Sequence, residues 1–216
     1  MKSVLVIGMG RFGRHLSMKM AELGNEVMVV DQDEEKVQDI LPFVTNAQIG
    51  DCTKEDVLIS LGVSDFDICF VCIGSNFQSS LEVTSLLKEL GAKFVVSKAN
   101  RDIHQKFLLR NGADRVIYPD KNIAEKCAMQ YSANNVFDYI GITGDISIYE
   151  LPVLRNWVGK SIRNIDIRSR YNLNILGIKN SEHLDPMPDP DRIFHENDHV
   201  MIIGKNKDIE RLFKVI

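Results

Sequence analysis

Short apolar runs alternate with mixed stretches through the first 130 or so residues of the chain. Each run holds three to six residues with few polar interruptions, which is typical of a parallel strand buried on both faces. Six strands are predicted in this part of the chain, at residues 4–7, 27–30, 47–49, 68–73, 94–96 and 116–118.

The stretches between these runs predict helices. Phe12, Leu16, Met20 and Leu23 are three or four positions apart and form one apolar helix face. Gly24 and Asn25 then give a stop signal. Helices are predicted at residues 12–23, 55–61, 78–90, 103–110 and 123–133. The alternation of strands and helices predicts an α/β fold with a doubly wound parallel sheet.

The pattern changes after residue 134. Short strands are predicted at 148–153, 175–178 and 200–203, with turn-rich stretches between them and a closing helix at 206–213. We therefore expect two domains: residues 1–134, which end in a crossover helix at about 120–133, and a small α+β domain at residues 135–216.

A glycine motif follows the first strand directly, as Gly8-Met9-Gly10-Arg11-Phe12-Gly13. Gly8 permits a tight turn, Gly10 lets the backbone approach a phosphate, and Gly13 lets the helix pack close to the strand. The N–H groups and the dipole at the start of the helix then favour an anion. Asp31, at the end of the second strand, can accept hydrogen bonds from the ribose hydroxyls of an adenosine. This combination predicts a Rossmann-like nucleotide-binding domain.

In such folds the ligand lies at the carboxyl ends of the strands. The predicted nucleotide-binding residues are Gly8, Met9, Gly10, Arg11, Phe12, Gly13, Asp31, Gln32, Asp51, Cys52, Ile73, Gly74, Ser75, Asn76 and Lys98. Lys98 is equally well explained as a surface charge.

Composition narrows the functional classes. A net charge of −4 and a pI near 5.8 argue against nucleic acid as a partner. No apolar run approaches the roughly 18–20 residues that span a bilayer, and we expect a cytoplasmic protein. Cys69 and Cys72 have the spacing of a metal or redox pair. On a strand, however, they would point to opposite faces, so we expect two buried thiols instead.

Several motifs in this order resemble the regulator-of-potassium-conductance (RCK) family. They are VLVIGMGRFG at 4–13, GDCT at 50–53, CIGSNFQSS at 72–80, VSKAN at 96–100, GADRVIYPDKN at 112–122, GKSIRNIDIRSRYNLNILGIK at 159–179 and HENDHVMIIG at 195–204. The likeness covers nearly the whole chain and is to the KtrA/TrkA-type subunits of bacterial potassium uptake systems.

The resemblance implies a gating subunit rather than an enzyme. Such subunits form dimers that assemble into an octameric ring beneath a separate membrane potassium-translocating subunit of the KtrB/TrkH type. They bind ATP or ADP, or in some members NAD(H). The alternative is an NAD(H)-binding redox sensor or a small NAD-dependent oxidoreductase. Against an enzyme, the chain lacks a Tyr-x-x-x-Lys pair, and its second domain is small for a substrate domain.

The resemblance also implies roles for individual residues. Arg11 matches an arginine that senses the γ-phosphate, and its alternative is a solvated charge. Asp120 stands where the family often has a glutamate that binds a divalent cation, Mg²⁺ or Ca²⁺; its alternative is the N-cap of the crossover helix. Asp166, Arg168 and Asn174 match positions that bind cyclic di-AMP in some relatives, and their alternative is an ordinary charged edge.

Overall fold

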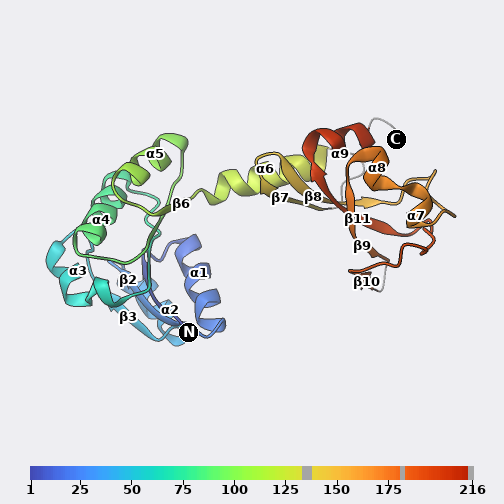
Figure 1. Ribbon diagram of the computed structural model, residues 1–216. Coiled ribbons are helices and arrows are strands. Elements are labelled where there is room, and N and C mark those ends of the chain that lie inside the picture. Colours follow the sequence, from blue (N-terminus) through green and yellow to red (C-terminus); the bar gives the residue numbers. More distant parts are fainter. Residues whose placement is uncertain (133–137, 181–182, 214–216) are drawn as a thin grey trace. The chain divides into compact units, whose positions relative to one another are not determined.

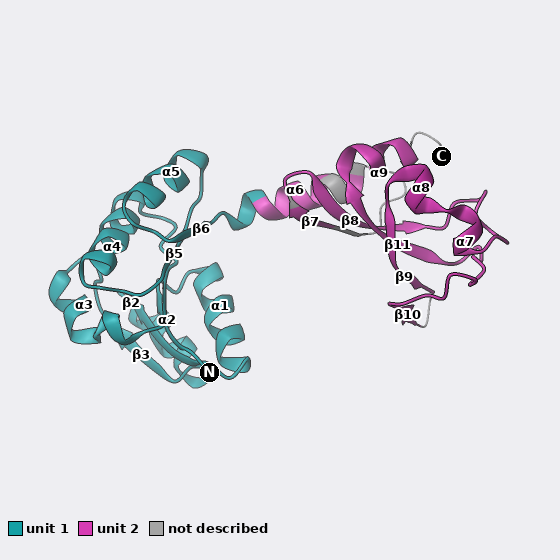
Figure 2. Cartoon of the chain, viewed as in Figure 1, with its two compact units in different colours: residues 1–121 teal, residues 122–216 magenta. Residues whose placement is uncertain are grey.

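The computed structural model describes residues 1–132, 138–180 and 183–213 (Figure 1). The chain forms two compact units, Met1–Lys121 and Asn122–Ile216, coloured separately in Figure 2. The domain boundary expected at residues 134 and 135 lies outside the described residues and stays a prediction.

The first unit is built on a six-stranded parallel sheet with the strand order β3-β2-β1-β4-β5-β6. This order confirms the predicted doubly wound fold. The order reverses between β1 and β4, so the topological switch point lies at the carboxyl ends of these two strands. The strands are β1 (Ser3–Ile7), β2 (Glu26–Asp31), β3 (Asn46–Ile49), β4 (Ile68–Val71), β5 (Val95–Lys98) and β6 (Arg115–Ile117).

Five of the helices that follow these strands match predicted ones. They are α1 (Arg11–Glu22), α3 (Glu55–Leu61), α4 (Phe77–Glu89), α5 (Asp102–Arg110) and α6 (Pro119–Ser132). Helix α6 begins at Pro119, earlier than predicted, because proline fits the first helical position. Asp120 therefore lies inside the first turn, and the N-cap alternative for it is wrong.

Helix α2 (Glu34–Ile40) was not predicted from the sequence. The Asp33 side chain caps it by accepting hydrogen bonds from the N–H groups of Glu35 and Lys36. Val37 and Ile40, three positions apart, are its buried residues. The helix has only seven residues, so the apolar pattern is too short to stand out.

Strands β1 and β4 carry apolar side chains on both faces of the sheet. Leu5 and Ile7 belong to one cluster of buried residues and Val4 and Val6 to the other. Cys69 belongs to the first cluster and Cys72 to the second. Both cysteines are buried thiols, and their places in two different clusters confirm the prediction that they face opposite sides of the sheet.

The second unit contains a five-stranded antiparallel sheet in the order β10-β9-β11-β8-β7. This confirms the predicted small α+β architecture, although β7, β10 and the two short helices were not predicted. The strands are β7 (Asp138–Thr143), β8 (Ile146–Pro152), β9 (Asn174–Lys179), β10 (Leu184–Asp185) and β11 (His199–Lys205), and the helices are α7 (Ile162–Ile165), α8 (Ile167–Tyr171) and α9 (Asn206–Phe213).

A buried ion pair supports the turn before β11. The Asp198 carboxylate is 3% exposed and accepts hydrogen bonds from Arg192 at 2.7 and 3.0 Å and from the His195 N–H at 2.8 Å. Burial raises the pKa of this carboxyl, but the bonds from Arg192 and His195 outweigh that effect and hold the pKa below its ordinary value.

We expect Asp198→Asn to lower the free energy of unfolding of the second unit by about 2–3 kcal/mol, because it leaves the Arg192 charge without its partner. The native carboxylate stabilises the fold above its unfolded pKa of about 3.9, and this contribution is lost as pH falls through the lower folded value. Denaturant unfolding followed by Trp157 fluorescence measures both effects. Asp191→Asn removes an exposed ion pair with Arg163 and is the matched control, for which little change is expected.

Candidate functional site

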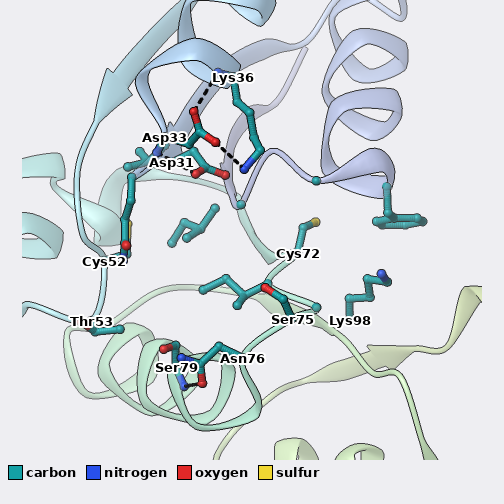
Figure 3. Close-up of a pocket in the computed structure, with 18 of the residues that line it drawn as sticks. Asp31, Asp33, Lys36, Cys52, Thr53, Cys72, Ser75, Asn76, Ser79 and Lys98 are labelled. Atoms are coloured by element: carbon teal, nitrogen blue, oxygen red, sulfur yellow. Dashed lines mark hydrogen bonds and ion pairs between the residues drawn. The ribbon is translucent and has the colours of Figure 1, made fainter.

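A cavity of about 830 Å³ lies within the first unit, at the carboxyl ends of its strands (Figure 3). It brings together most of the residues predicted from the sequence. The predicted residues that line it are Gly8, Gly10, Arg11, Phe12, Asp31, Gln32, Asp51, Cys52, Ile73, Gly74, Ser75, Asn76, Lys98 and Asp120. Met9 and Gly13, which were predicted with them, do not line it.

The three glycines of the turn have different surroundings. A Cβ on Gly8 would lie 3.1 Å from backbone atoms of Cys72 and Ile73, and the φ of Gly8 is +97°. A Cβ on Gly13 would lie 2.0 Å from the Gly8 carbonyl oxygen. A Cβ on Gly10 would meet no atom within 4 Å. Gly8 and Gly13 are therefore required by the fold, whereas Gly10 leaves open space beside the cavity.

Helix α1 begins at this turn without a side-chain cap. Gly10 is its N-cap, and no acidic residue lies in its first turn. Helix α4, by contrast, is capped by Asn76, whose side chain accepts a hydrogen bond from the Ser79 N–H at 3.1 Å. No side chain in the described part of the chain caps the first N–H groups of α1, so these groups are available to an anionic ligand.

Asp31 joins β2 to the glycine turn. Its Oδ2 accepts a hydrogen bond from the Met9 N–H at 2.5 Å, and its Oδ1 accepts one from the Asp33 N–H at 3.0 Å. Met9 contributes this N–H while its side chain packs in the core. Each carboxylate oxygen retains a lone pair, so Asp31 can also accept a hydrogen bond from a ligand in the cavity.

Asp51 closes the cavity beside β3. Its Oδ1 accepts hydrogen bonds from the Thr53 hydroxyl at 2.7 Å, the Thr53 N–H at 3.0 Å and the Gln32 amide at 2.7 Å. The bonds from Thr53 are the main reason that the pKa of Asp51 lies below its ordinary value. The carboxylate is therefore ionised and held in place.

Two cations line the cavity without an ion pair. Lys98 lies with its Nζ 5.9 Å from the centre of the Phe12 ring, beside Gly74. Arg11, in the first turn of α1, is exposed. No ion pair formed within the described part of the chain includes Arg11 or Lys98. Unpaired cations in a cavity favour an anionic ligand.

Several lining residues were not predicted from the sequence, namely Ile7, Val30, Asp33, Lys36, Gly50, Thr53, Cys72, Ser79 and Asn100. Asp33 and Lys36 were not predicted to line a site because helix α2, to which they belong or which they cap, was not predicted. Asn100 follows β5, and its amide donates a hydrogen bond to the Gly74 carbonyl oxygen. Its position after the end of a strand is the sequence feature from which it could have been predicted as a lining residue.

The described residues of the cavity offer neither a reactive thiol nor a metal site made of protein ligands alone. Burial, the main cause, raises the pKa of Cys52 and that of Cys72 to about 12. Neither thiol is therefore a nucleophile near neutral pH. The described residues contain no group of three or more His, Cys, Asp or Glu side chains placed to hold a metal. Asp120 lines the cavity and belongs to no such group among these residues.

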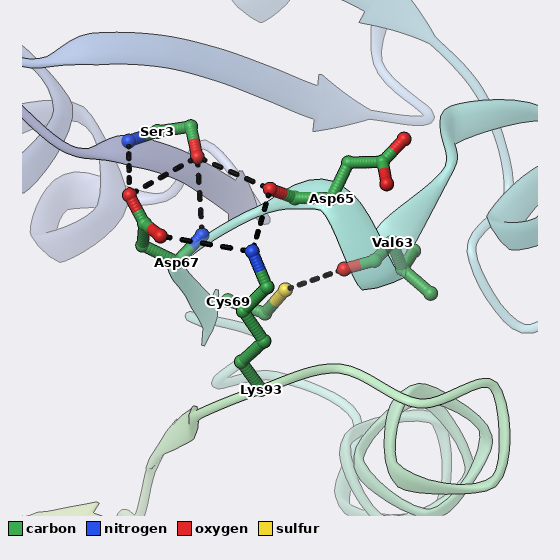
Figure 4. A network of polar contacts seen from close by, with 6 residues as sticks. All are labelled: Ser3, Val63, Asp65, Asp67, Cys69 and Lys93. Atoms are coloured by element: carbon green, nitrogen blue, oxygen red, sulfur yellow. Dashed lines mark hydrogen bonds and ion pairs between the residues drawn. The ribbon is translucent and has the colours of Figure 1, made fainter.

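A separate polar network joins the amino ends of β1 and β4, at the edge of the sheet away from the cavity (Figure 4). Asp67 Oδ2 accepts hydrogen bonds from the Ser3 N–H at 3.0 Å and the Ser3 hydroxyl at 3.3 Å. Lys93 Nζ lies 3.7 Å from the Asp67 carboxylate and donates to the Asp65 carbonyl oxygen. The Ser3 N–H is the main reason that the pKa of Asp67 is below its ordinary value. This network supports the strand register away from the cavity.

Comparison with known proteins identifies a family for each half of the chain. The TrkA-N domain family matches residues 4–119, and the TrkA-C domain family matches residues 146–216. The chain belongs to the TrkA (RCK) family. Its TrkA-N domain holds the cavity, and the resemblance noted from the motifs is confirmed. No helix among the described residues of this TrkA-type chain is long and apolar enough to cross a membrane.

Relatives of this TrkA-type chain match it over nearly their full length. The Ktr system potassium uptake protein A of Bacillus subtilis is 40% identical over 97% of this chain and 95% of the relative. Protein C of the same organism is 37% identical over 99% of this chain and 96% of the relative. With such relatives, the chain is a non-enzymatic RCK protein, as predicted.

Solved structures confirm the fold of the TrkA-type chain. The crystal structure of the GsuK RCK domain superposes with a TM-score of 0.70 at 20% identity, covering 100% of this chain and 47% of that one. A GsuK channel bound to NAD gives the same TM-score over 98% of this chain and 39% of that one. A GsuK structure bound to ADP gives 0.54 over 62% of this chain and 36% of that one.

Proposed function

We propose that this chain is the nucleotide-sensing regulatory subunit of a Ktr-type potassium uptake system. The observation that carries the proposal is the full-length likeness to Ktr proteins A and C. The chain would work in the cytoplasm, at the inner face of the membrane, bound to a separate potassium-translocating subunit. It would do so as a homo-oligomer, with dimers assembled into an octameric ring. Symmetric closed assemblies of this kind are common for soluble subunits.

The cavity supports an adenine nucleotide as the ligand. Asp31 and the glycine turn suit the ribose and the first phosphates, and the start of α1 offers N–H groups to an anion. Arg11 and Lys98 add two positive charges that no ion pair among the described residues neutralises, which favours the extra charge of ATP or ADP over a dinucleotide.

Regulation would follow from a population shift. ATP and ADP can move the chain between two conformations only as far as their affinities for the two conformations differ. Arg11 is the residue that we expect to make this difference, because only ATP carries a γ-phosphate. Arg11 would therefore make the conformation of the ring depend on the phosphorylation state of the nucleotide.

A divalent cation, Mg²⁺ or Ca²⁺, would be held by Asp120 together with phosphate oxygens of the nucleotide. Asp120 is a hard oxygen ligand in the first turn of α6 and lines the cavity. One carboxylate alone is a weak site, which fits a cation that binds only with the nucleotide.

The alternative is an NAD(H)-binding redox sensor or a small NAD-dependent oxidoreductase. The observation that favours NAD(H) is the GsuK channel bound to NAD, which has the same fold. The alternative requires that NADH bind more tightly than ATP. An oxidoreductase would in addition change the absorbance of the nicotinamide in the presence of a substrate.

A second ligand, cyclic di-AMP, is proposed for the TrkA-C domain. Arg168 Nε donates a hydrogen bond to Asn174 Oδ1 at 2.8 Å, so two of the three residues implied by the resemblance lie together. The third, Asp166, accepts a bond from the Ser169 hydroxyl at 2.9 Å and has a left-handed φ of +48°. Titration of the chain with cyclic di-AMP tests this site.

The experiment that tests the proposed function is complementation. A bacterial strain without its own Ktr regulatory proteins is given this chain together with the membrane subunit from the same source. We expect potassium uptake to be restored, and growth at low external potassium with it. Expression of both proteins without any gain in uptake over the membrane subunit alone would contradict the proposal.

A further inference from the structure

The ribose side of the cavity contains a cation that the proposed function does not use. Lys36 lines the cavity from the first turn of α2, and its Nζ lies 2.8 Å from Asp33 Oδ2. Figure 3 shows Lys36 and Asp33 beside Asp31, with Lys98 apart from them. Lys36 is thus the ammonium group that lies next to the carboxylate expected to bind a ribose.

The ion pair between Lys36 and Asp33 is easily exchanged. Both side chains are nearly half exposed, at 47% and 43%, and an exposed pair of this spacing contributes little to stability. Asp33 also has a separate role, because its Oδ1 caps α2 through two backbone N–H groups. Lys36 can therefore turn to a ligand without loss of the cap.

The donors and acceptors on this side complement a hydroxyl group. A hydroxyl donates one hydrogen bond and accepts others, whereas a carboxylate only accepts and an ammonium only donates. Asp31 supplies the acceptor. The amide of Gln32 already donates to Asp51 at 2.7 Å, which leaves Lys36 as the charged donor beside Asp31.

We propose that Asp31 and Lys36 together recognise one ribose hydroxyl, and that the cavity therefore prefers ribonucleotides to deoxyribonucleotides. This inference rests on the proposed nucleotide binding and names the sugar that the site requires. Lys36 leaves Asp33 when the nucleotide binds and donates to the hydroxyl oxygen, while the hydroxyl proton is donated to Asp31. A sugar that lacks this hydroxyl leaves both charged groups without a ligand partner, and a site of this kind discriminates against it.

Calorimetric titration of the whole chain with ATP, 2′-deoxy-ATP and 3′-deoxy-ATP tests the inference. We expect the wild type to bind ATP about tenfold more tightly than one of the two deoxy analogues. Lys36→Met should weaken ATP binding but not the binding of that analogue, so that the ratio falls to about twofold or threefold. Lys19→Met is the matched control, since Lys19 also pairs with a carboxylate three positions away but lies outside the cavity.

The outcomes separate the inference from the function on which it rests. A wild type that binds ATP and both analogues equally overturns the inference alone, as does a ratio that Lys36→Met leaves unchanged. A wild type that binds no nucleotide overturns the proposed nucleotide binding and the inference with it. Circular dichroism confirms that each variant is folded before it is titrated.

Discussion

Gly13→Ala is expected to destabilise the first unit by at least about 3 kcal/mol, because the added methyl would lie 2.0 Å from the Gly8 carbonyl oxygen. That oxygen belongs to the backbone of the turn, and the added methyl would also lie 3.2 Å from the Cβ of Cys72, so it would be crowded from two parts of the chain. Helix α1 would be forced away from the sheet, and the glycine turn that lines the cavity would be displaced with it. Chemical denaturation followed by circular dichroism measures the effect.

Gly10→Ala is the matched control for this effect. The same methyl at Gly10 meets no atom within 4 Å, and its backbone has an ordinary φ of −65°. We expect the fold to keep its stability while nucleotide binding weakens, because the methyl occupies the space through which a phosphate approaches the backbone. Equal stability losses for Gly10→Ala and Gly13→Ala would contradict the assigned roles of the two glycines.

Arg11→Ala is expected to weaken ATP binding about 10-fold to 100-fold and ADP binding about threefold or less. The reason is that a guanidinium forms strong forked hydrogen bonds to a terminal phosphate, and ADP has no γ-phosphate to accept them. Calorimetric titration with both nucleotides measures the two affinities.

Arg14→Ala provides the control for Arg11, because Arg14 lies on the same helix but pairs with Asp39 and does not line the cavity. It should leave both affinities unchanged. If Arg11→Ala reduces ATP and ADP binding by the same factor, Arg11 is a general phosphate contact and the proposed sensing of the γ-phosphate is wrong.

The sequence predicts the first unit well because its strands are buried on both faces. Such strands appear as apolar runs, and Gly8, Gly10 and Gly13 mark where the first one turns into a helix. A site at the carboxyl ends of the strands then follows from the fold class. Most residues predicted at these ends do line one cavity.

What the sequence could not predict depends on short elements and on side-chain direction. Helix α2 has seven residues, so Asp33 and Lys36 were not recognised as lining residues. Met9 stands within the glycine motif, yet its side chain turns into the core and only its N–H serves the site. Helices α7 and α8, with four and five residues, are too short to show a periodic pattern.

Calorimetric titration of the whole chain with ATP, ADP, NAD and NADH, each with and without Mg²⁺, tests the proposed sensing of adenine nucleotides directly. We expect ATP and ADP to bind more tightly than either dinucleotide, and the affinities of ATP and ADP to differ from each other. Tight binding of NADH together with weak binding of ATP would contradict this proposal, and would favour a redox sensor in place of an adenine-nucleotide sensor.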